Sequence, residues 1–193
     1  MQSPFEGRLV RLRAREETDL ERFFRWLNDP EVTQYIELRY PVSVEQERQI
    51  LAGAPPADYE GARFSIDTLD GVHIGSCALR NSSAEDRSAD LGITIGDKGY
   101  WNGGYGTDAM RVLCRFGFEH MNLHRIELHV FSDNPRAQRV YENVGFKVEG
   151  CLRDADYRYG HYRDVVVMGL LRDDFQDQLS APSAASQPSG ESK

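Results

Sequence analysis

The sequence predicts an α/β (α+β) fold in which a mixed central sheet is flanked by about four helices. Apolar residues recur with strand and helix periods in the order strand, two helices, hairpin, strand, helix, strand, helix and two strands. The chain has 193 residues, of which 40% are hydrophobic and 28% charged. A chain of this length and composition folds as one domain with a packed core.

The first predicted elements are a short strand and two helices. Residues 9–13 alternate weakly and predict the strand. Thr18 is expected to cap a helix that stops at residues 28–30. Apolar residues of this helix recur at helical spacing: Leu20, Phe23, Phe24 and Leu27. Ser43-Val44-Glu45-Gln46 is a capping-box pattern and predicts a second helix up to about Ala52.

A hairpin and a further strand follow. Residues 63–67 and 72–79 are strand-like, and the Asp70-Gly71 pair between them is typical of a hairpin turn. Residues 89–95 alternate cleanly and predict the next strand. One face of that strand carries Ala89, Leu91, Ile93 and Ile95. The opposite face carries Asp90, Gly92 and Thr94.

The last third of the fold alternates between helix and strand. Residues 107–121 form an amphipathic pattern that predicts a long helix, and residues 125–131 alternate as a strand. Asn134-Pro135 starts a helix that ends at Gly145, and residues 146–149 and 164–171 are the closing strands. We expect a single domain over residues 1–175 and a disordered, low-complexity tail over residues 176–193.

Charge and cysteine content exclude several classes of protein. The formal net charge of -8, from 31 acidic and 23 basic residues, argues against a nucleic-acid partner and weakly favours a cationic or amine substrate. Three cysteines without a metal-type spacing argue against a disulfide framework. The N-terminus resembles no secretory signal, and the longest apolar run is far below the ~20 residues of a membrane helix. A cytoplasmic protein without a membrane partner is expected.

A glycine-rich turn precedes the long helix, where backbone N–H groups and the helix dipole favour an anion. The turn has the sequence Asn102-Gly103-Gly104-Tyr105-Gly106-Thr107. It partly matches the dinucleotide-binding pattern, with Glu127 near the ribose-binding position, but too few elements follow for that fold. A phosphate-loop NTPase is excluded, because no Gly-Lys-Ser or Gly-Lys-Thr is present.

A second motif, residues 134–146, follows the strand that ends at Phe131. Together with the glycine-rich turn it resembles the GNAT N-acetyltransferase superfamily, and in particular its ribosomal-protein-alanine and spermidine acetyltransferase branch. The resemblance covers roughly residues 8 to 175 and implies a mostly antiparallel sheet and acetyl-CoA as cosubstrate. In the family's motif, Trp101 replaces the usual Gln or Arg.

The resemblance also implies a cofactor site. The backbone of Ile93 and Ile95 would bind the pantetheine arm like an added strand. Residues 102–107 would then bind the pyrophosphate: Asn102, Gly103, Gly104, Tyr105, Gly106 and Thr107. Asn134 and Ala137 would contact the cofactor near its sulfur. No metal is expected, because His120 and His124 lack a third ligand.

Direct acetyl transfer requires a neutral amine, a polarised carbonyl and a proton for the departing thiolate. Tyr141 matches the family's general acid, and Asp90 matches the strand position where relatives carry a Glu that acts as a base through water. The alternative for Tyr141 is a structural role as an aromatic residue of the core. The alternative for Asp90 is a solvent-exposed charge on a strand without a catalytic role. A bulge near Gly92 or Thr94 is expected to free a backbone N–H for the developing oxyanion.

The sequence therefore predicts an acetyl-CoA-dependent N-acetyltransferase that acts on a protein N-terminus or a small amine. A polyamine acetyltransferase is the alternative within the enzyme class, and a non-catalytic acyl-CoA sensor is the alternative outside it. Residues 31–40 and 153–162 are expected to shape the acceptor pocket. The aromatic cluster of Tyr157, Tyr159, His161 and Tyr162 could line a substrate entrance or cover a sheet edge, and we favour the structural role. The sequence leaves a homodimer open.

Overall fold

The computed structural model describes residues 3–52, 59 and 61–177, and in this part of the chain seven strands form one mixed sheet. The strands are β1 (Val10–Arg13), β2 (Gly61–Thr68), β3 (His73–Ser83), β4 (Ser88–Ile95), β5 (Arg125–Phe131), β6 (Lys147–Arg158) and β7 (His161–Leu171). Their order across the sheet is β1-β2-β3-β4-β5-β7-β6. Every pairing is antiparallel except that of β4 with β5.

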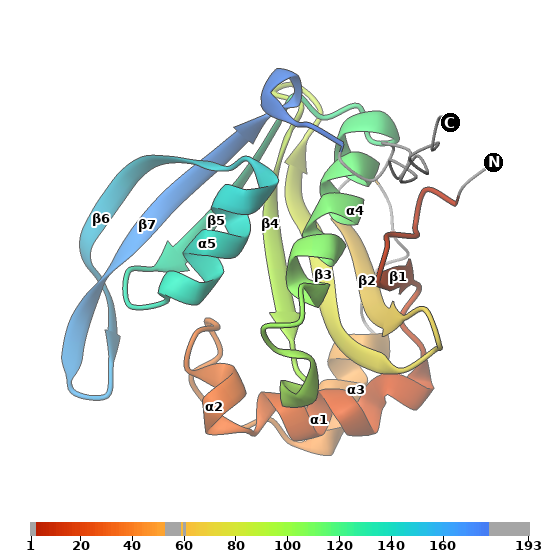
Figure 1. The fold of residues 1–193 in the computed structure, drawn as a ribbon. Helices are drawn as coiled ribbons and strands as arrows, with labels where there is room; N and C mark the ends of the chain where they lie inside the picture. Colours follow the sequence, from red (N-terminus) through yellow and green to blue (C-terminus); the bar gives the residue numbers. More distant parts are fainter. Residues whose placement is uncertain (1–2, 53–58, 60, 178–193) are drawn as a thin grey trace, which may run out of the picture.

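The helices of the described residues are α1 (Leu20–Leu27), α2 (Pro30–Thr33), α3 (Val44–Ala52), α4 (Tyr105–Glu119) and α5 (Pro135–Val144). Figure 1 shows α4 and α5 on one side of the sheet, α4 over β3 and β4, and α5 over β5 and β7. The short helices α1, α2 and α3 gather at one end of the sheet. The predicted mixed, mostly antiparallel sheet with flanking helices is confirmed.

The core lies between α4 and the sheet. Side chains from both layers are fully buried there, including Ile66, Ile74, Leu79, Met110, Leu113, Leu123, Ile126, Met168 and Leu170. On β4, Ala89 and Leu91 are buried on this face, whereas Asp90, Gly92 and Thr94 lie on the other. The polar face of β4 is therefore free for a ligand, while the apolar face fixes the strand against α4.

Several local predictions are confirmed. Ser43 and Gln46 form the capping box of α3, with each side chain accepting a hydrogen bond from the other's backbone N–H. Asn134 caps α5, and Gly145 ends the helix with a φ of 114°. The strand over residues 125–131 has the predicted bounds.

Other predictions are wrong at the ends of elements. Thr18 caps no helix, because a 3-10 turn over Glu17–Asp19 precedes α1 and a capping box between Glu16 and Asp19 starts that turn. The helix α4 begins at Tyr105, two residues earlier than predicted. Beyond residue 177, the predicted disordered tail lies outside the described residues. The single-domain boundary at residue 175 stays a prediction.

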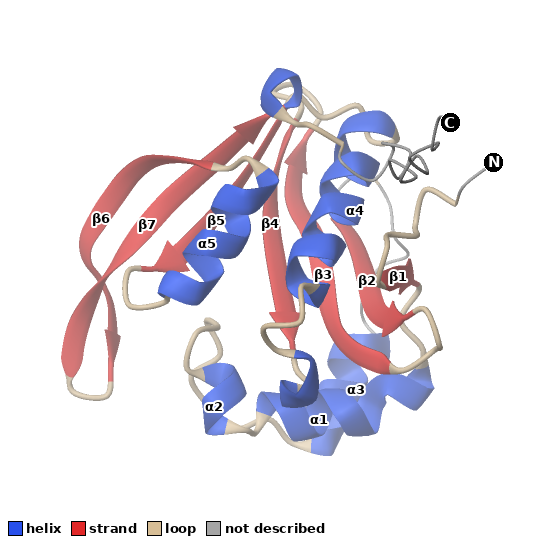
Figure 2. Cartoon of the chain, viewed as in Figure 1, coloured by secondary structure: helices blue, strands red, loops and turns tan. Residues whose placement is uncertain are grey.

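The closing strands are much longer than predicted. β6 and β7 form a long hairpin that extends from the body of the molecule (Figure 2). β6 is exposed along both faces over most of its length, and its register shifts twice. An edge strand that buries neither face shows no alternation of apolar and polar residues, which explains why the pattern did not predict it.

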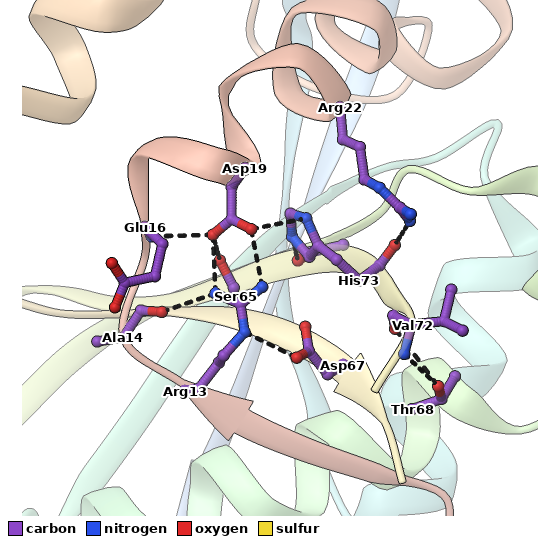
Figure 3. A network of polar contacts seen from close by, with 11 residues as sticks. Arg13, Ala14, Glu16, Asp19, Arg22, Ser65, Asp67, Thr68, Val72 and His73 are labelled. Carbon is purple, nitrogen blue, oxygen red and sulfur yellow. Dashed lines mark hydrogen bonds and ion pairs between the residues drawn. The ribbon is translucent and has the colours of Figure 1, made fainter. Parts of the chain in front are cut away.

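A buried ion-pair network joins the N-terminal strand to α1 (Figure 3). Asp19, only 3% exposed, accepts two hydrogen bonds from the Arg13 guanidinium at 2.7 and 2.8 Å. It also accepts from Ser65 Oγ at 2.8 Å and from the Glu16 N–H at 3.0 Å. Arg13 Nε in turn donates to Asp67 at 2.7 Å. The network fixes the start of α1 to β1 and β2.

Substituting Asp19 is expected to destabilise the fold in a pH-dependent way. Burial alone would raise the pKa of Asp19, but hydrogen bonds from Arg13, Glu16 and Ser65 outweigh it and lower the pKa below its usual range. The stabilisation is therefore complete above the unfolded-state pKa of about 3.9 and is lost as the pH falls further. Asp19→Asn should cost about 3 kcal/mol at pH 7, and urea denaturation of both proteins measures it.

The control is Glu21→Gln, which removes an exposed pair with Arg25 on the surface of α1. That variant should lie within about 0.5 kcal/mol of the unmodified protein. The gap between Asp19→Asn and the unmodified protein should shrink between about pH 4 and pH 2. A gap that stays constant over this range would contradict the assigned role of the Asp19 charge.

Candidate active site

The central strands β4 and β5 separate halfway along the sheet. They pair only where Ser88–Asp90 meets Arg125–Glu127. Beyond this point β4 continues to pair with β3, and β5 continues to pair with β7. We call the opening between residues 91–95 of β4 and residues 128–131 of β5 the fork. Within the described residues, the backbone groups of β4 that face the fork have no strand partner, so all but the Ile95 carbonyl, which accepts from Trp101, are available to an extended ligand.

The predicted bulge near Gly92 or Thr94 is wrong. The register between β3 and β4 is regular from the Gly75–Ile95 pair to the Arg80–Asp90 pair, and the irregularity lies between Arg80 and Ser83. The fork arises instead because β5 follows β7, with which all seven of its residues pair. Each central strand belongs to its own half of the sheet, and the two halves diverge.

Two cavities meet at the fork. The small cavity, of about 310 Å³, lies between β4, the start of α4 and α5. The large cavity, of about 830 Å³, lies over the polar face of the sheet. Five residues line both of them: Tyr35, Ile36, Ile93, Thr94 and Tyr141. Groups bound in the two cavities would therefore meet beside Tyr141.

The glycine-rich turn forms one end of the small cavity. Trp101 Nε1 donates to the Ile95 carbonyl at 2.7 Å and closes the turn onto the end of β4. Gly104, with a φ of 85°, is the N-cap of α4. The first three N–H groups of a helix have no acceptor within it, and here they belong to Tyr105, Gly106 and Thr107. This donor set fits a pyrophosphate.

The structure separates the predicted cofactor residues into two groups. Lining the small cavity are Ile93, Ile95, Asn102, Gly104, Gly106, Thr107, Asn134 and Ala137. Gly103 and Tyr105 do not line it, and the Tyr105 ring packs against Tyr100 at 5.0 Å between centroids. Asn134 is buried, and its Oδ1 accepts from the Ala137 N–H at 3.1 Å. Its first role is therefore to cap α5 and so to orient Tyr141.

Tyr141 lies on α5 where the two cavities meet. Its ring contacts Phe146 in an edge arrangement, with centroids 6.2 Å apart. Burial raises the pKa of the Tyr141 hydroxyl to about 12. The hydroxyl therefore keeps its proton at neutral pH and can act only as a hydrogen donor or acceptor, not as a phenolate.

Two carboxylates face each other across the base of the fork. Asp90 on β4 is the register partner of Glu127 on β5, and both line the large cavity. Asp90 accepts a hydrogen bond from Asn81 Nδ2 at 2.6 Å. Glu127 is paired with Arg125 at 3.0 Å. Among the described residues, Glu127 thus forms an ion pair, whereas Asp90 forms a hydrogen bond with a neutral amide.

Sequence analysis missed Glu127 and His129 as residues of this site. Both line the large cavity, and the alternating pattern of β5 placed them on one face of the strand, opposite the buried Leu128. The predicted pocket segments do contribute, through Glu37 and Arg39 from one and Ala155 and Asp156 from the other. The second segment belongs to the β6–β7 hairpin and is not a loop.

Other features bear on the excluded classes of function. Within the described residues, no group of three or more His, Cys, Asp or Glu could bind a metal ion. The same part of the chain contains no helix that is long and apolar enough to cross a membrane. Cys77 and Cys114 are buried free thiols, whereas Cys151 is exposed. The cytoplasmic location stays a prediction.

Comparison with known proteins gives one family. The model of the acetyltransferase (GNAT) domain matches residues 9–147. An uncharacterized N-acetyltransferase p20 of Bacillus licheniformis is 31% identical over 91% of this chain and 99% of its own length. The spermidine N(1)-acetyltransferase of Vibrio cholerae is 32% identical over 83% of this chain and 92% of its own length.

A solved structure agrees with these relatives. The crystal structure of spermidine N-acetyltransferase from Vibrio cholerae in complex with CoA and spermine superposes with a TM-score of 0.79 and 27% identity. The match covers 86% of this chain and 96% of the other. The forked sheet, the helix start at the small cavity and these matches lead to one conclusion: the chain belongs to the GNAT acetyltransferase family, whose enzymes transfer an acetyl group from acetyl-CoA to an amine.

Proposed function

We propose that this enzyme binds acetyl-CoA in the small cavity and acetylates a primary amine, on a protein N-terminus or a small molecule, in the large cavity. The meeting of the two cavities beside Tyr141 carries this proposal. Acetyl-CoA supplies an acetyl group that is activated as a thioester. Everything else in the reaction depends on how the chain orients the two reactants and moves protons.

The small cavity offers two kinds of backbone donor. The N–H groups at the start of α4 suit the pyrophosphate, with the helix dipole adding to the attraction. The fork-facing backbone of Ile93 and Ile95 suits the amide groups of the pantetheine arm, which would pair with β4 as a short extra strand. The arm would then run along β4 towards Tyr141.

Asp90 is assigned the role of base, acting through water. An α-amine with a pKa near 8, or a lysine-like amine near 10.4, is largely protonated at neutral pH and must lose a proton before it can attack. Asp90 lies on the polar face of β4 at the base of the fork and lines the large cavity. The new C–N bond then forms as the C–S bond breaks.

Tyr141 is assigned the role of hydrogen donor to the departing sulfur. A thiol has a pKa of about 8.5, so full proton transfer from a hydroxyl with a pKa of about 12 is uphill by roughly 5 kcal/mol. Donation of a hydrogen bond to the sulfur is therefore the main contribution at the moment of bond breaking. As the amide forms, the attacking nitrogen loses its second proton, and this proton neutralises the departing thiolate.

A polyamine acceptor is the second candidate. The spermidine acetyltransferases among the relatives favour it. Two acidic side chains of the large cavity, Glu37 and Asp90, also favour a cationic acceptor. Thiol release measured with spermidine and with N-terminal peptides separates the two acceptors.

Filling the small cavity is expected to block the cofactor without unfolding the protein. A Cβ at Gly106 would meet only Ile95 Cγ1, at an ordinary 3.7 Å, so Gly106→Leu should leave the fold intact. The longer side chain should weaken CoA binding by at least about 10-fold in calorimetry, because it competes with the phosphates for the helix start. Gly150→Leu, at an open position on β6, is the control. Equal CoA affinity in both variants would contradict the assigned cofactor site.

Removal of the Tyr141 hydroxyl should lower turnover and leave cofactor affinity unchanged. Tyr141→Phe keeps the ring contact with Phe146, so kcat should fall by at least about 10-fold while the calorimetric Kd for CoA stays the same. Tyr159→Phe, at the exposed end of the β6–β7 hairpin, serves as the control. Unchanged turnover in Tyr141→Phe would remove this residue from the mechanism.

The two carboxylates of the fork can be distinguished by isosteric substitution. Asp90→Asn should lower kcat/KM by about 100-fold, because the amine loses its proton acceptor. Glu127→Gln should have a much smaller effect, since Arg125 already occupies that carboxylate. Thiol-release kinetics over pH 6 to 10 measure both variants. A larger loss in Glu127→Gln would move the role of base to Glu127.

A further inference from the structure

The large cavity has a cationic wall that acetyl transfer by itself does not require. Arg15, which follows β1, Arg63 on β2 and Arg80 on β3 all line it. Arg63 lies in cross-strand register with Ala78, which in turn pairs with Gly92 at the fork. Within the described part of the chain, none of these three arginines forms an ion pair with a carboxylate.

Two of the four acids that line the same cavity form ion pairs with arginines. Asp156 is buried and pairs with both Arg163 and Arg39, each at 2.8 Å. Glu127 pairs with Arg125. Two further acids remain on the lining, Glu37 and Asp90. Arg15 and Arg63 stand on the β1–β2 side of the cavity, whereas Asp90 stands at the fork with Arg80 as its register partner on β3.

Arg15 is the residue of this wall that most clearly indicates a binding site for an anion. Its Nε is buried without any hydrogen-bond partner. Burial lowers the pKa of Arg15, and the neighbouring charge of Arg63 lowers it further. Glu47 is close enough to act on Arg15 electrostatically, but no ion pair joins them, and burial raises the pKa of that carboxyl. Within the described residues neither Arg15 nor Arg63 forms an ion pair, and two neighbouring guanidinium groups of this kind are suited to bind a carboxylate.

We propose that the acceptor is zwitterionic, an amino acid or a short peptide whose amine lies at the fork and whose carboxylate binds Arg15 and Arg63. This inference rests on the proposed function and names its substrate class. Neighbouring strands are about 4.8 Å apart, so Arg63 on β2 lies roughly 10 Å from β4 at the backbone. The arginine side chain covers part of this span, which leaves room for an acceptor of amino-acid size.

The same wall disfavours a polycation. A polyamine carries only positive charges, and in a partly desolvated cavity its distal ammonium groups would meet Arg15, Arg63 and Arg80. An amino acid offers complementary charge at both ends, an ammonium towards Asp90 and a carboxylate towards the arginines. Charge segregation in the cavity thus decides between acceptors that the catalytic residues alone would treat alike.

The test compares acceptors that differ only in the carboxylate. Thiol release is measured for a panel of L-amino acids, for the corresponding amino acid amides and for spermidine. We expect kcat/KM to be at least about 10-fold higher for the acids than for the amides, mainly through KM. Arg63→Gln should reduce this preference to less than about 3-fold, and Arg63→Lys should restore part of it. Arg25→Gln, an exposed change on α1, should keep the full preference.

A binding measurement supplies a second readout. Calorimetry on the CoA-saturated enzyme should show tighter binding of N-acetyl amino acids than of N-acetyl amino acid amides, and Arg15→Gln or Arg63→Gln should abolish the difference. Circular dichroism checks that each variant is folded. An equal loss of affinity for the N-acetyl amino acids and for their amides would overturn the inference. An arginine with only a structural role would affect the binding of both ligands to the same extent.

The outcomes separate the inference from the function on which it rests. If the amides or spermidine are acetylated with the same kcat/KM as the amino acids, the proposed carboxylate site is wrong. The proposed acetyltransferase function is then unaffected. If no amine releases thiol, the proposed function fails. In that case the calorimetry with N-acetyl amino acids still decides whether Arg15 and Arg63 bind a carboxylate.

Discussion

The divergence of β4 and β5 after the Asp90–Glu127 pair is the constraint on which the site depends. A closed sheet would have satisfied the facing backbone groups of residues 91–95 and 128–131, at about 1 kcal/mol net per hydrogen bond. The fork forgoes this stabilisation and leaves polar backbone in two open cavities. A ligand with peptide-like amides can replace the missing strand partner. Stability given up in the sheet thus becomes binding energy for a cofactor.

The two halves of the sheet contribute different parts of the chemistry. β4 carries Asp90 and leads directly into the glycine-rich turn and α4. β5 leads into α5, where the Asn134 cap fixes the helix that carries Tyr141. The proposed base, Asp90, and the proposed hydrogen donor, Tyr141, therefore come from opposite sides of the fork, and any shift between the halves of the sheet changes the distance between them. Buried contacts such as the Asp19 network stabilise one half of this frame (Figure 3).

The charged residues of the large cavity also fall into two groups, those that form ion pairs and those that do not. The net charge of -8 suggests attraction of any cation, but the average over the chain says little about one cavity. Asp156 and Glu127 are compensated by arginines, whereas Arg15 and Arg63 are not. The acidic residues of the whole chain therefore set the long-range attraction of a cation. The charged residues of the cavity wall set the short-range selection of the acceptor. We therefore expect the wall of the large cavity, and not the overall composition, to determine which amines are accepted.

The sequence by itself determined the elements whose signals are local. The caps of α3 and α5, the Asp70-Gly71 hairpin and the strand over residues 125–131 follow from side chains and periods within a few residues. The resemblance to the family further indicated Tyr141, Asp90 and the glycine-rich turn. The length of the edge strand β6 was not predicted, because a strand that is exposed on both faces has no hydrophobic period.

Only the tertiary structure decided how distant segments meet. No bulge opens the sheet at Gly92, since the fork results from pairing preferences of β4 and β5 with different neighbours. Glu127 came to lie beside Asp90 through a parallel pairing across residues 90 and 127. Arg15 and Arg63 share a wall because β2 returns beside β1. Such contacts depend on packing between residues far apart in the chain, which a local pattern does not encode.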